Sequence, residues 1–284
     1  MPAALDPALR FLCCPHCSGA FRRELGAIVC DRRHSFDVSR QGFVNLLGAA
    51  PPANADRADM VEARVRFLDT GRYAPLAEAI AELAQQATRL AEPRSTCILD
   101  VGAGPGSYLA RVLAACAGFQ GIACDVSTFA ARRAARCHER AAAVVADVAR
   151  LPVSSQVVTL LLTVFSPRNP VEFRRVLHPH GRWLVVTPTS EHLASLRAPL
   201  GLLDIEPGKD ERLLAEADAE FMLVHAQTLA IDLTLGRADA LALLAMGPAA
   251  FHLAPATRAA RVAALAEPIT TRASFTLRLL APRA

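Results

Sequence analysis

The sequence predicts an α/β protein in which a mostly parallel, doubly wound sheet follows a small metal-binding module. From Thr96 onward, short apolar runs alternate with helical stretches, which is typical of parallel strands buried on both faces. The first fifty residues instead concentrate Cys, His, Gly and Arg in short alternating runs, and they are too few to fold on a hydrophobic core alone. With 284 residues, 52% of them hydrophobic, the chain can bury a large core in its second part.

The expected elements follow from the periodicity of apolar residues and from the turn residues between them. A small strand is expected at 26–29, and a Pro/Ala linker at 49–54. Helices are expected at 59–68, 77–90, 108–117, 128–138 and 238–244. Strands of the sheet are expected at 97–101, 121–125, 143–147, 157–164, 183–187, 228–234 and 275–280. The predicted domains are a zinc-binding module at 1–48, a linker with helices at 49–92 and the main domain at 93–284.

Composition excludes some partners and leaves others open. No apolar run approaches the ~18 residues of a membrane span, and the N-terminus lacks the pattern of a signal peptide, so we expect a cytoplasmic protein without a membrane partner. The net charge of +4 is uneven, because residues 201–250 carry three basic against nine acidic side chains and leave +10 elsewhere. The basic part either approaches a polyanion, with the acidic segment facing away, or is merely a solvated surface.

The sharpest spacing is Cys14-x2-Cys17-x12-Cys30-x3-His34. Two closely spaced pairs joined by a hairpin can supply the four tetrahedral ligands of Zn²⁺, and four protein ligands indicate a structural site. Cys13 leaves the register ambiguous, because it could replace Cys14 as a ligand. The remaining cysteines lie in apolar segments and are expected in the core as reduced thiols: Cys97, Cys116, Cys124 and Cys137.

A second motif is the glycine-rich turn after the strand at 97–101. Gly102, Gly104 and Gly106 would let a ligand approach the backbone, and Asp125, at the end of the next strand, could accept hydrogen bonds from ribose hydroxyls. Enzymes that bind NAD also combine a glycine-rich turn with an acidic residue at the end of the next strand. The G-x-G-x-G spacing, however, suits the amino-acid end of S-adenosylmethionine (SAM) better than a pyrophosphate, and Asp100 lies where methyltransferases have an acidic residue.

The segments that follow support the same class. Asp147, with Leu151-Pro152 behind it, resembles the element bordering the adenine in class I SAM-dependent methyltransferases, and 173–185 is similar to the class pattern R-x-L-x-P-G-G-x-L, with His180 replacing a glycine. The main domain is therefore predicted to be a Rossmann-like class I methyltransferase domain. Phe165-Ser166-Pro167-Arg168-Asn169 stands where methyltransferases of exocyclic base amines have Asn/Asp-Pro-Pro-aromatic. That segment also has no catalytic Cys in a T-C or P-C motif, so methylation at carbon 5 of a pyrimidine is disfavoured.

The chain as a whole resembles the RlmA/TlrB-type 23S ribosomal RNA (guanine-N1)-methyltransferases. The resemblance spans roughly 12–280 and rests on the zinc spacing, the glycine turn and the segments 34–37, 41–47, 60–76 and 187–193. It implies that Cys14, Cys17, Cys30 and His34 bind zinc, and that Tyr73 and His192 join Gly104 and Pro105 around SAM. Tyr73 could instead pack in the linker, and His192 could simply end a helix. Arg64, Arg66 and Arg168 either contact RNA phosphates or form surface ion pairs.

The resemblance also implies the function. We expect the methyl of SAM to be transferred to N1 of a guanine in a 23S rRNA hairpin loop near the macrolide-binding exit tunnel, by a homodimer whose zinc module grips the RNA; DNA is not an expected partner. The segment 165–169 resembles the branch that protects against tylosin- or mycinamicin-type macrolides.

The target-base pocket is expected around Phe165, Ser166, Pro167 and Arg168, and the sequence identifies no general base. Two alternative functions stay open. One is a small-molecule methyltransferase of an antibiotic pathway, and the other is a zinc-ribbon RNA-binding protein with an inactive SAM fold.

Overall fold

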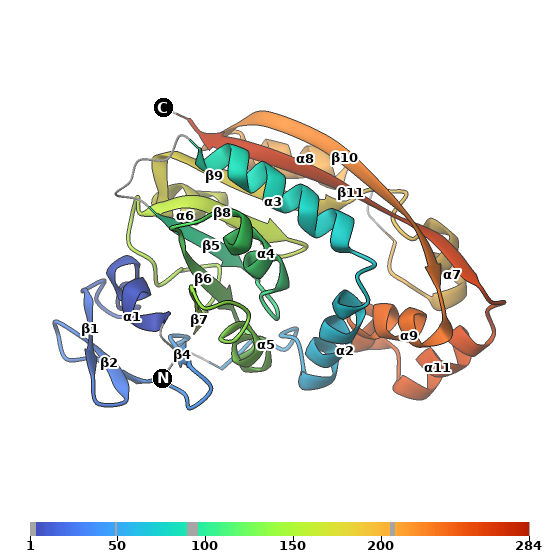
Figure 1. Ribbon diagram of the computed structural model, residues 1–284, viewed down its shortest axis with the longest axis horizontal. Helices are drawn as coiled ribbons and strands as arrows, with labels where there is room; N and C mark the ends of the chain where they lie inside the picture. The colour runs from blue at the N-terminus through green and yellow to red at the C-terminus, as the bar shows by residue number, and fades with distance from the viewer. Residues whose placement is uncertain (1–3, 49, 90–95, 205–207, 284) are drawn as a thin grey trace.

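The centre of the molecule is an eight-stranded sheet in the order β10-β11-β9-β8-β5-β6-β7-β4 (Figure 1). It is seen in a computed structural model that describes residues 4–48, 50–89, 96–204 and 208–283. The strands are β4 (Phe43–Asn45), β5 (Cys97–Val101), β6 (Gln120–Asp125), β7 (Ala141–Val145), β8 (Val158–Val164), β9 (Leu177–Pro188), β10 (Phe221–Leu235) and β11 (Ile269–Pro282). β4 to β9 run parallel, whereas β11 pairs antiparallel with β9 and β10 antiparallel with β11. The predicted parallel α/β core is thus confirmed, with two antiparallel strands added at one edge.

Helices cover both faces of this sheet because the parallel strands are apolar on both sides. Along β5, Ile98 packs into the cluster that contains α3 and α4, and Leu99 packs into the cluster beneath α1 and α6. The helices of these two layers are α1 (Leu5–Ala8), the 3₁₀ turn η1 (Leu9–Phe11), α3 (Ala74–Thr88), α4 (Ser107–Ala115), α5 (Thr128–Ala134), α6 (Pro170–Val176) and α8 (Lys209–Ala217). The sheet is therefore doubly wound, as its sequence pattern predicts.

A three-stranded antiparallel sheet forms the N-terminal module, at the opposite end of the molecule from the end at which β10 finishes and β11 begins (Figure 1). Its strands are β1 (Phe21–Glu24), β2 (Ala27–Cys30) and β3 (Ser35–Asp37). The module is hydrogen-bonded to the main domain at several points, among them the bond from Gln120 Nε2 to the Ala4 carbonyl at 3.0 Å. β4 pairs in parallel with β7, and the Cys13 N–H donates to the Pro152 carbonyl at 3.0 Å.

The long antiparallel strands β10 and β11 reach past the rest of the sheet, and the remaining helices, three of which connect these two strands, gather at their far end (Figure 1). They are α2 (Ala58–Asp69), α7 (Ala194–Leu200), α9 (Arg237–Ala245), α10 (Ala249–His252) and α11 (Pro255–Ala263). The two predicted linker helices are thus α2 and α3, although position 90 and the predicted boundary at 92/93 lie outside the described residues. Among the described residues, no helix has the length and apolarity needed to cross a membrane.

Candidate functional site

The strand order reverses between β5 and β8, and at such a point of an open α/β sheet ligands bind in the crevice between the loops that leave the carboxyl ends of the strands. The glycine turn leaves β5 at this point, and the segment starting at Phe165 leaves β8 beside it. The two segments touch, because a Cβ added at Gly102 would lie 2.3 Å from Ser166 Cβ. The Ser166 hydroxyl also donates to the Val101 carbonyl at 2.6 Å. The structure therefore brings the predicted cofactor turn and the predicted target-base segment together.

The conformation of the turn requires its glycines. Gly102, Gly104 and Gly106 all have positive φ values, of 70°, 55° and 82°, which L side chains adopt only with strain. A Cβ at Gly106 would also lie 2.7 Å from the Sγ of Cys137, a half-buried thiol that packs against the turn. The other three cysteines predicted in the core, Cys97, Cys116 and Cys124, are buried.

Two acidic side chains lie beneath the turn. Asp125 is held by two backbone N–H groups, with Gly104 donating to Oδ2 and Ser127 to Oδ1, each at 2.8 Å. Asp100 is 1% exposed and its Oδ2 has no hydrogen-bond partner. Burial, and secondarily the neighbouring Asp125 carboxylate, raises the pKa of Asp100 to about 7. A buried carboxylate without a partner is costly, so the crevice suits a ligand that brings a hydrogen-bond donor or a positive charge.

An aromatic row connects the residues that the family resemblance places around SAM. The ring of Phe275, on β11, lies 5.2 Å from Tyr73, 4.8 Å from His192 and 5.3 Å from Phe165. Burial first, and then the charge of Arg197, lowers the pKa of His192 to about 4, so its imidazole is neutral at pH 7. Phe275 was missed in the sequence, where it is only one apolar residue within a predicted strand.

The remaining predicted residues follow the carboxyl ends of β5, β7 and β8. Asp147 follows β7, and its Oδ1 accepts a hydrogen bond from the Ala149 N–H at 2.9 Å. Pro105 is buried within the glycine turn, whereas Phe165 is 44% exposed with a φ of 58°. Pro167 is exposed beside it and Arg168 is half-buried. The glycine cradle and the unpartnered Asp100 carboxylate fit SAM, whose amino-acid end carries an amine and whose sulfur carries a positive charge.

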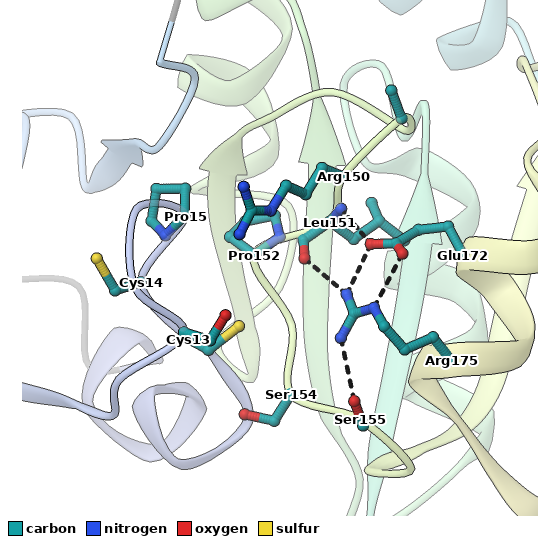
Figure 2. A pocket seen from close by; sticks show the side chains of 12 residues that line it. Cys13, Cys14, Pro15, Arg150, Leu151, Pro152, Ser154, Ser155, Glu172 and Arg175 are labelled. Atoms are coloured by element: carbon teal, nitrogen blue, oxygen red, sulfur yellow. Dashed lines mark hydrogen bonds and ion pairs between the residues drawn. The ribbon is translucent and has the colours of Figure 1, made fainter.

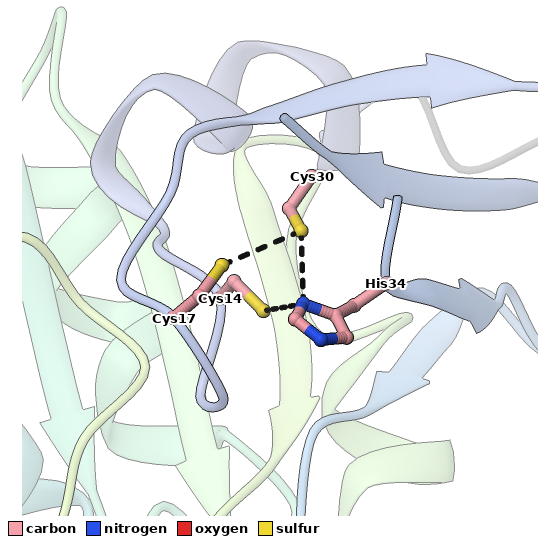
Figure 3. Close-up of side chains that lie close together, drawn as sticks. All are labelled: Cys14, Cys17, Cys30 and His34. Carbon is pink, nitrogen blue, oxygen red and sulfur yellow. Dashed lines mark hydrogen bonds between the residues drawn. The ribbon is translucent and has the colours of Figure 1, made fainter. Parts of the chain in front are cut away.

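The four predicted metal ligands form one cluster (Figure 3). Their ligand atoms all lie within 4.8 Å of one another. His34 Nδ1 is 3.5 Å from Cys14 Sγ and 3.3 Å from Cys30 Sγ, and the Sγ atoms of Cys17 and Cys30 are 3.6 Å apart. Tetrahedral Zn²⁺ with bonds of ~2.0–2.3 Å separates its ligand atoms by about 3.5–3.8 Å, so the cluster fits zinc. Cys13 lies outside this cluster, which settles the register in favour of Cys14.

The surroundings of Cys30 favour the thiolate that zinc binds. Burial opposes ionisation of this thiol, but hydrogen bonds from the His34 backbone and from the Cys17 and His34 side chains outweigh it and lower the pKa of Cys30 to about 6. The knuckle residues Cys14 to Cys17 and β2 thus bring the ligands together in a ribbon built around the metal.

A cavity of about 510 Å³ lies between this ribbon and the main domain, beside the point where the two are hydrogen-bonded (Figure 2). Cys13, Cys14 and Pro15 line its ribbon side, and Arg150 with Arg175 lines the other. Arg175 is already occupied, because it binds the Glu172 carboxylate through two nitrogens and donates to the Leu151 carbonyl at 2.9 Å. The charge of Arg175 is therefore neutralised by Glu172.

Comparison with known proteins agrees with both the zinc cluster and the methyltransferase prediction for the main domain. The family model described as RlmA, N-terminal, a zinc ribbon, matches residues 12–52. A 23S rRNA (guanine(748)-N(1))-methyltransferase of Streptomyces fradiae is 42% identical over 95% of this chain and 96% of its own length. The chain belongs to the 23S rRNA (guanine-N1)-methyltransferase family. Another relative, a candidate 23S rRNA (guanine-N(1)-)-methyltransferase of Micromonospora griseorubida, is 45% identical over 88% of this chain and 89% of its own.

Membership in this methyltransferase family confirms the resemblance seen in the sequence. A more distant relative, the candidate 23S rRNA (guanine-N(1)-)-methyltransferase YxjB of Bacillus subtilis, is 35% identical over 65% of this chain and 66% of its own. The N-terminal module is a zinc ribbon with Cys14, Cys17, Cys30 and His34 as its ligand set.

Proposed function

We propose that this methyltransferase transfers the methyl group of SAM to N1 of a guanine in a 23S rRNA hairpin loop. The observation that carries the proposal is the contact between Gly102 and Ser166, which puts the cofactor turn against the segment of Phe165. A half-exposed aromatic ring directly beside the cofactor turn can stack on a base that has left its own stack. The name of the Streptomyces fradiae relative specifies guanine 748, and we take the equivalent base as the target.

On this proposal the cofactor binds in the crevice between β5, β6 and β8. Asp125 accepts hydrogen bonds from the ribose hydroxyls with the lone pairs left free by Gly104 and Ser127. Asp100 faces the amine, and Asp147 borders the adenine. Tyr73 and His192 complete the wall through their ring contacts with Phe275. These groups orient the cofactor and exclude water.

Catalysis then depends mainly on alignment, because bound SAM supplies a methyl group that is already activated by the sulfonium. Phe165 and Pro167 are the exposed members of the target-base segment and would hold the guanine plane. Ser166 has a different part, since its hydroxyl is bound to the Val101 carbonyl and ties this segment to β5. Arg168 lies one residue further on, where it would contact the base or its phosphate.

The zinc ribbon is proposed to grip the RNA hairpin. Arg22, Arg32, Arg33 and Arg40 are exposed on this small module, and guanidinium groups suit phosphate contacts. Several such contacts make affinity fall steeply as the salt concentration rises. A small-molecule methyltransferase would show no such salt-dependent RNA binding.

We infer that the enzyme acts in the cytoplasm, where ribosomes are found, as a homodimer. Three successive apolar residues on the outermost strand β10, Met222, Leu223 and Val224, are each about half exposed. An apolar outer strand of this kind needs cover, and a second copy of the chain, related by two-fold symmetry, would supply it. Light scattering after size exclusion tests this: Leu223→Lys should convert the dimer to a monomer, and a wild-type monomer would contradict it.

The proposed activity is tested with radiolabelled SAM and 23S rRNA fragments, followed by primer extension to locate the blocked base. A stop at the guanine equivalent to 748 supports the proposal, whereas label in small molecules or protein contradicts it. A protein that binds RNA but does not bind SAM would favour the inactive zinc-ribbon alternative.

We further propose that the modification protects ribosomes against tylosin- or mycinamicin-type macrolides. A sensitive host expressing the protein should therefore survive these drugs, and a strain expressing a variant that does not bind SAM should not.

A further inference from the structure

Arg64 lies directly over the glycine turn, although it belongs to helix α2, far from the turn in sequence. Its Nη1 would be 3.2 Å from a Cβ added at Gly104, and its Cδ 3.7 Å. Because Gly104 has no side chain, the Arg64 guanidinium has room directly above the turn. The sequence left open whether Arg64 contacts RNA phosphates or forms a surface pair, and the structure shows an ion pair with Asp56 that is partly buried and lies beside the glycine turn.

The guanidinium is fixed from two sides. Nη1 binds the Asp56 carboxylate, and Nη2 donates to the Met246 carbonyl at 2.8 Å. Asp56 is held in turn, because its backbone carbonyl accepts a hydrogen bond from the Ser127 hydroxyl at 2.6 Å. The Arg64 side chain is only 28% exposed. These contacts connect the segment before α2, the end of α9 and the start of α5, so the position of Arg64 depends on three separate parts of the fold.

The crevice is otherwise acidic. Asp100 and Asp125 lie beneath the turn, and Arg64 is a cation whose charge acts on Asp125 and on nearby Tyr108. A ligand with an amine and a carboxylate on the same carbon would meet a group of opposite charge at each end. The buried Asp100 would face its amine, and Arg64 would face its carboxylate. A guanidinium forms charge-assisted hydrogen bonds with a carboxylate, and Nη1 carries a second N–H besides the one directed to Asp56.

We propose that Arg64 binds the α-carboxylate of the cofactor over Gly104, with Asp56 as the positioning residue that aims the guanidinium. The inference rests on the proposed use of SAM and assigns one group of the cofactor to one side chain. Arg66, two residues along α2, has no such part, because it is exposed and lies 3.7 Å from Glu62 in an i,i+4 pair.

The test is calorimetric binding of two ligands, S-adenosylhomocysteine and its decarboxylated analogue, which keeps the amine and lacks only the carboxylate. Arg64→Leu should weaken S-adenosylhomocysteine binding by about 10- to 100-fold, the effect of a lost charge-assisted hydrogen bond. The same variant should bind the decarboxylated analogue with wild-type affinity, which also shows that it is folded. Arg64→Lys should recover part of the loss, and the matched control Arg66→Leu should bind both ligands like the wild type.

Each other outcome overturns the assignment. Equal weakening of both ligands by Arg64→Leu would mean that Arg64 only supports the fold, and unchanged binding of S-adenosylhomocysteine would mean that its carboxylate is held elsewhere. In both cases the wild type still binds the cofactor product, so the proposed function survives. A wild type that binds neither ligand would overturn the proposed function together with this inference.

Discussion

The rings of Phe275 and His192 lie 4.8 Å apart, although one belongs to the last strand of the sheet and the other precedes α7. Phe275 is fully buried and also contacts Tyr73 and Phe165. The proposed wall of the cofactor site therefore depends on a residue supplied by β11.

Replacing this ring should affect the cofactor as well as the fold. Phe275→Leu loses three aromatic contacts, worth about 1–3 kcal/mol of unfolding free energy in total, and should also weaken S-adenosylhomocysteine binding about tenfold. Phe221→Leu is the matched control, because this buried ring packs against Trp183 on the other face of the sheet. Denaturant melts and calorimetry should show similar destabilisation of both variants, with weaker binding only for Phe275→Leu. A binding defect of the same size in Phe221→Leu would contradict the special position of Phe275.

Removal of zinc should unfold the ribbon, because metal binding supplies the folding energy of such a small module. We expect hydrogen exchange to become fast across β1 to β3 on chelation, while S-adenosylhomocysteine still binds. Cys14→Ser should lose zinc in elemental analysis, and Cys13→Ser should retain one equivalent. The reverse result for these adjacent cysteines would place the ligand at Cys13.

Gly102 should tolerate no side chain. Gly102→Ala adds a Cβ that meets Ser166 Cβ at 2.3 Å, so it should separate the cofactor turn from the target-base segment and weaken S-adenosylhomocysteine binding more than tenfold. Gly118→Ala controls for backbone strain, because Gly118 also has a positive φ, of 81°, and its Cβ would meet no atom within 4 Å. Comparable binding by the two variants would show that the contact with Ser166 is unimportant.

The stability of the ligand-free enzyme should depend on pH through Asp100. Burial and Asp125 raise its pKa to about 7, above the ordinary value of 3.8, so folding favours the protonated form. This stabilisation is fully present below about pH 4 and is lost as the pH rises through about 7. Asp100→Asn should therefore raise the melting temperature at pH 8 by about 4–8 °C relative to the wild type and by much less at pH 4. An equal shift at both pH values would mean that Asp100 does not titrate in this range.

Local signals in the sequence predicted much of the fold and the site. The zinc ligands and the glycine turn depend on spacing within short segments, and the strand at 97–101 agrees with β5 residue for residue. The antiparallel pairing of β10 and β11 could not be predicted in the same way, because an apolar strand has the same pattern in either direction. Phe275 and Arg64 reach the crevice through long-range packing of β11 and α2, which leaves no signal in their neighbours along the chain.

The pairing of β4 with β7 has a consequence for the solubility of the enzyme. β7 consists only of Ala and Val, is buried along its whole length and would be the outer strand of the sheet without β4. An exposed edge of that composition is a template for pairing with other chains. By holding β4 in place, the metal-bound ribbon shields this edge, so loss of the metal should promote aggregation as well as weaken the proposed grip on RNA.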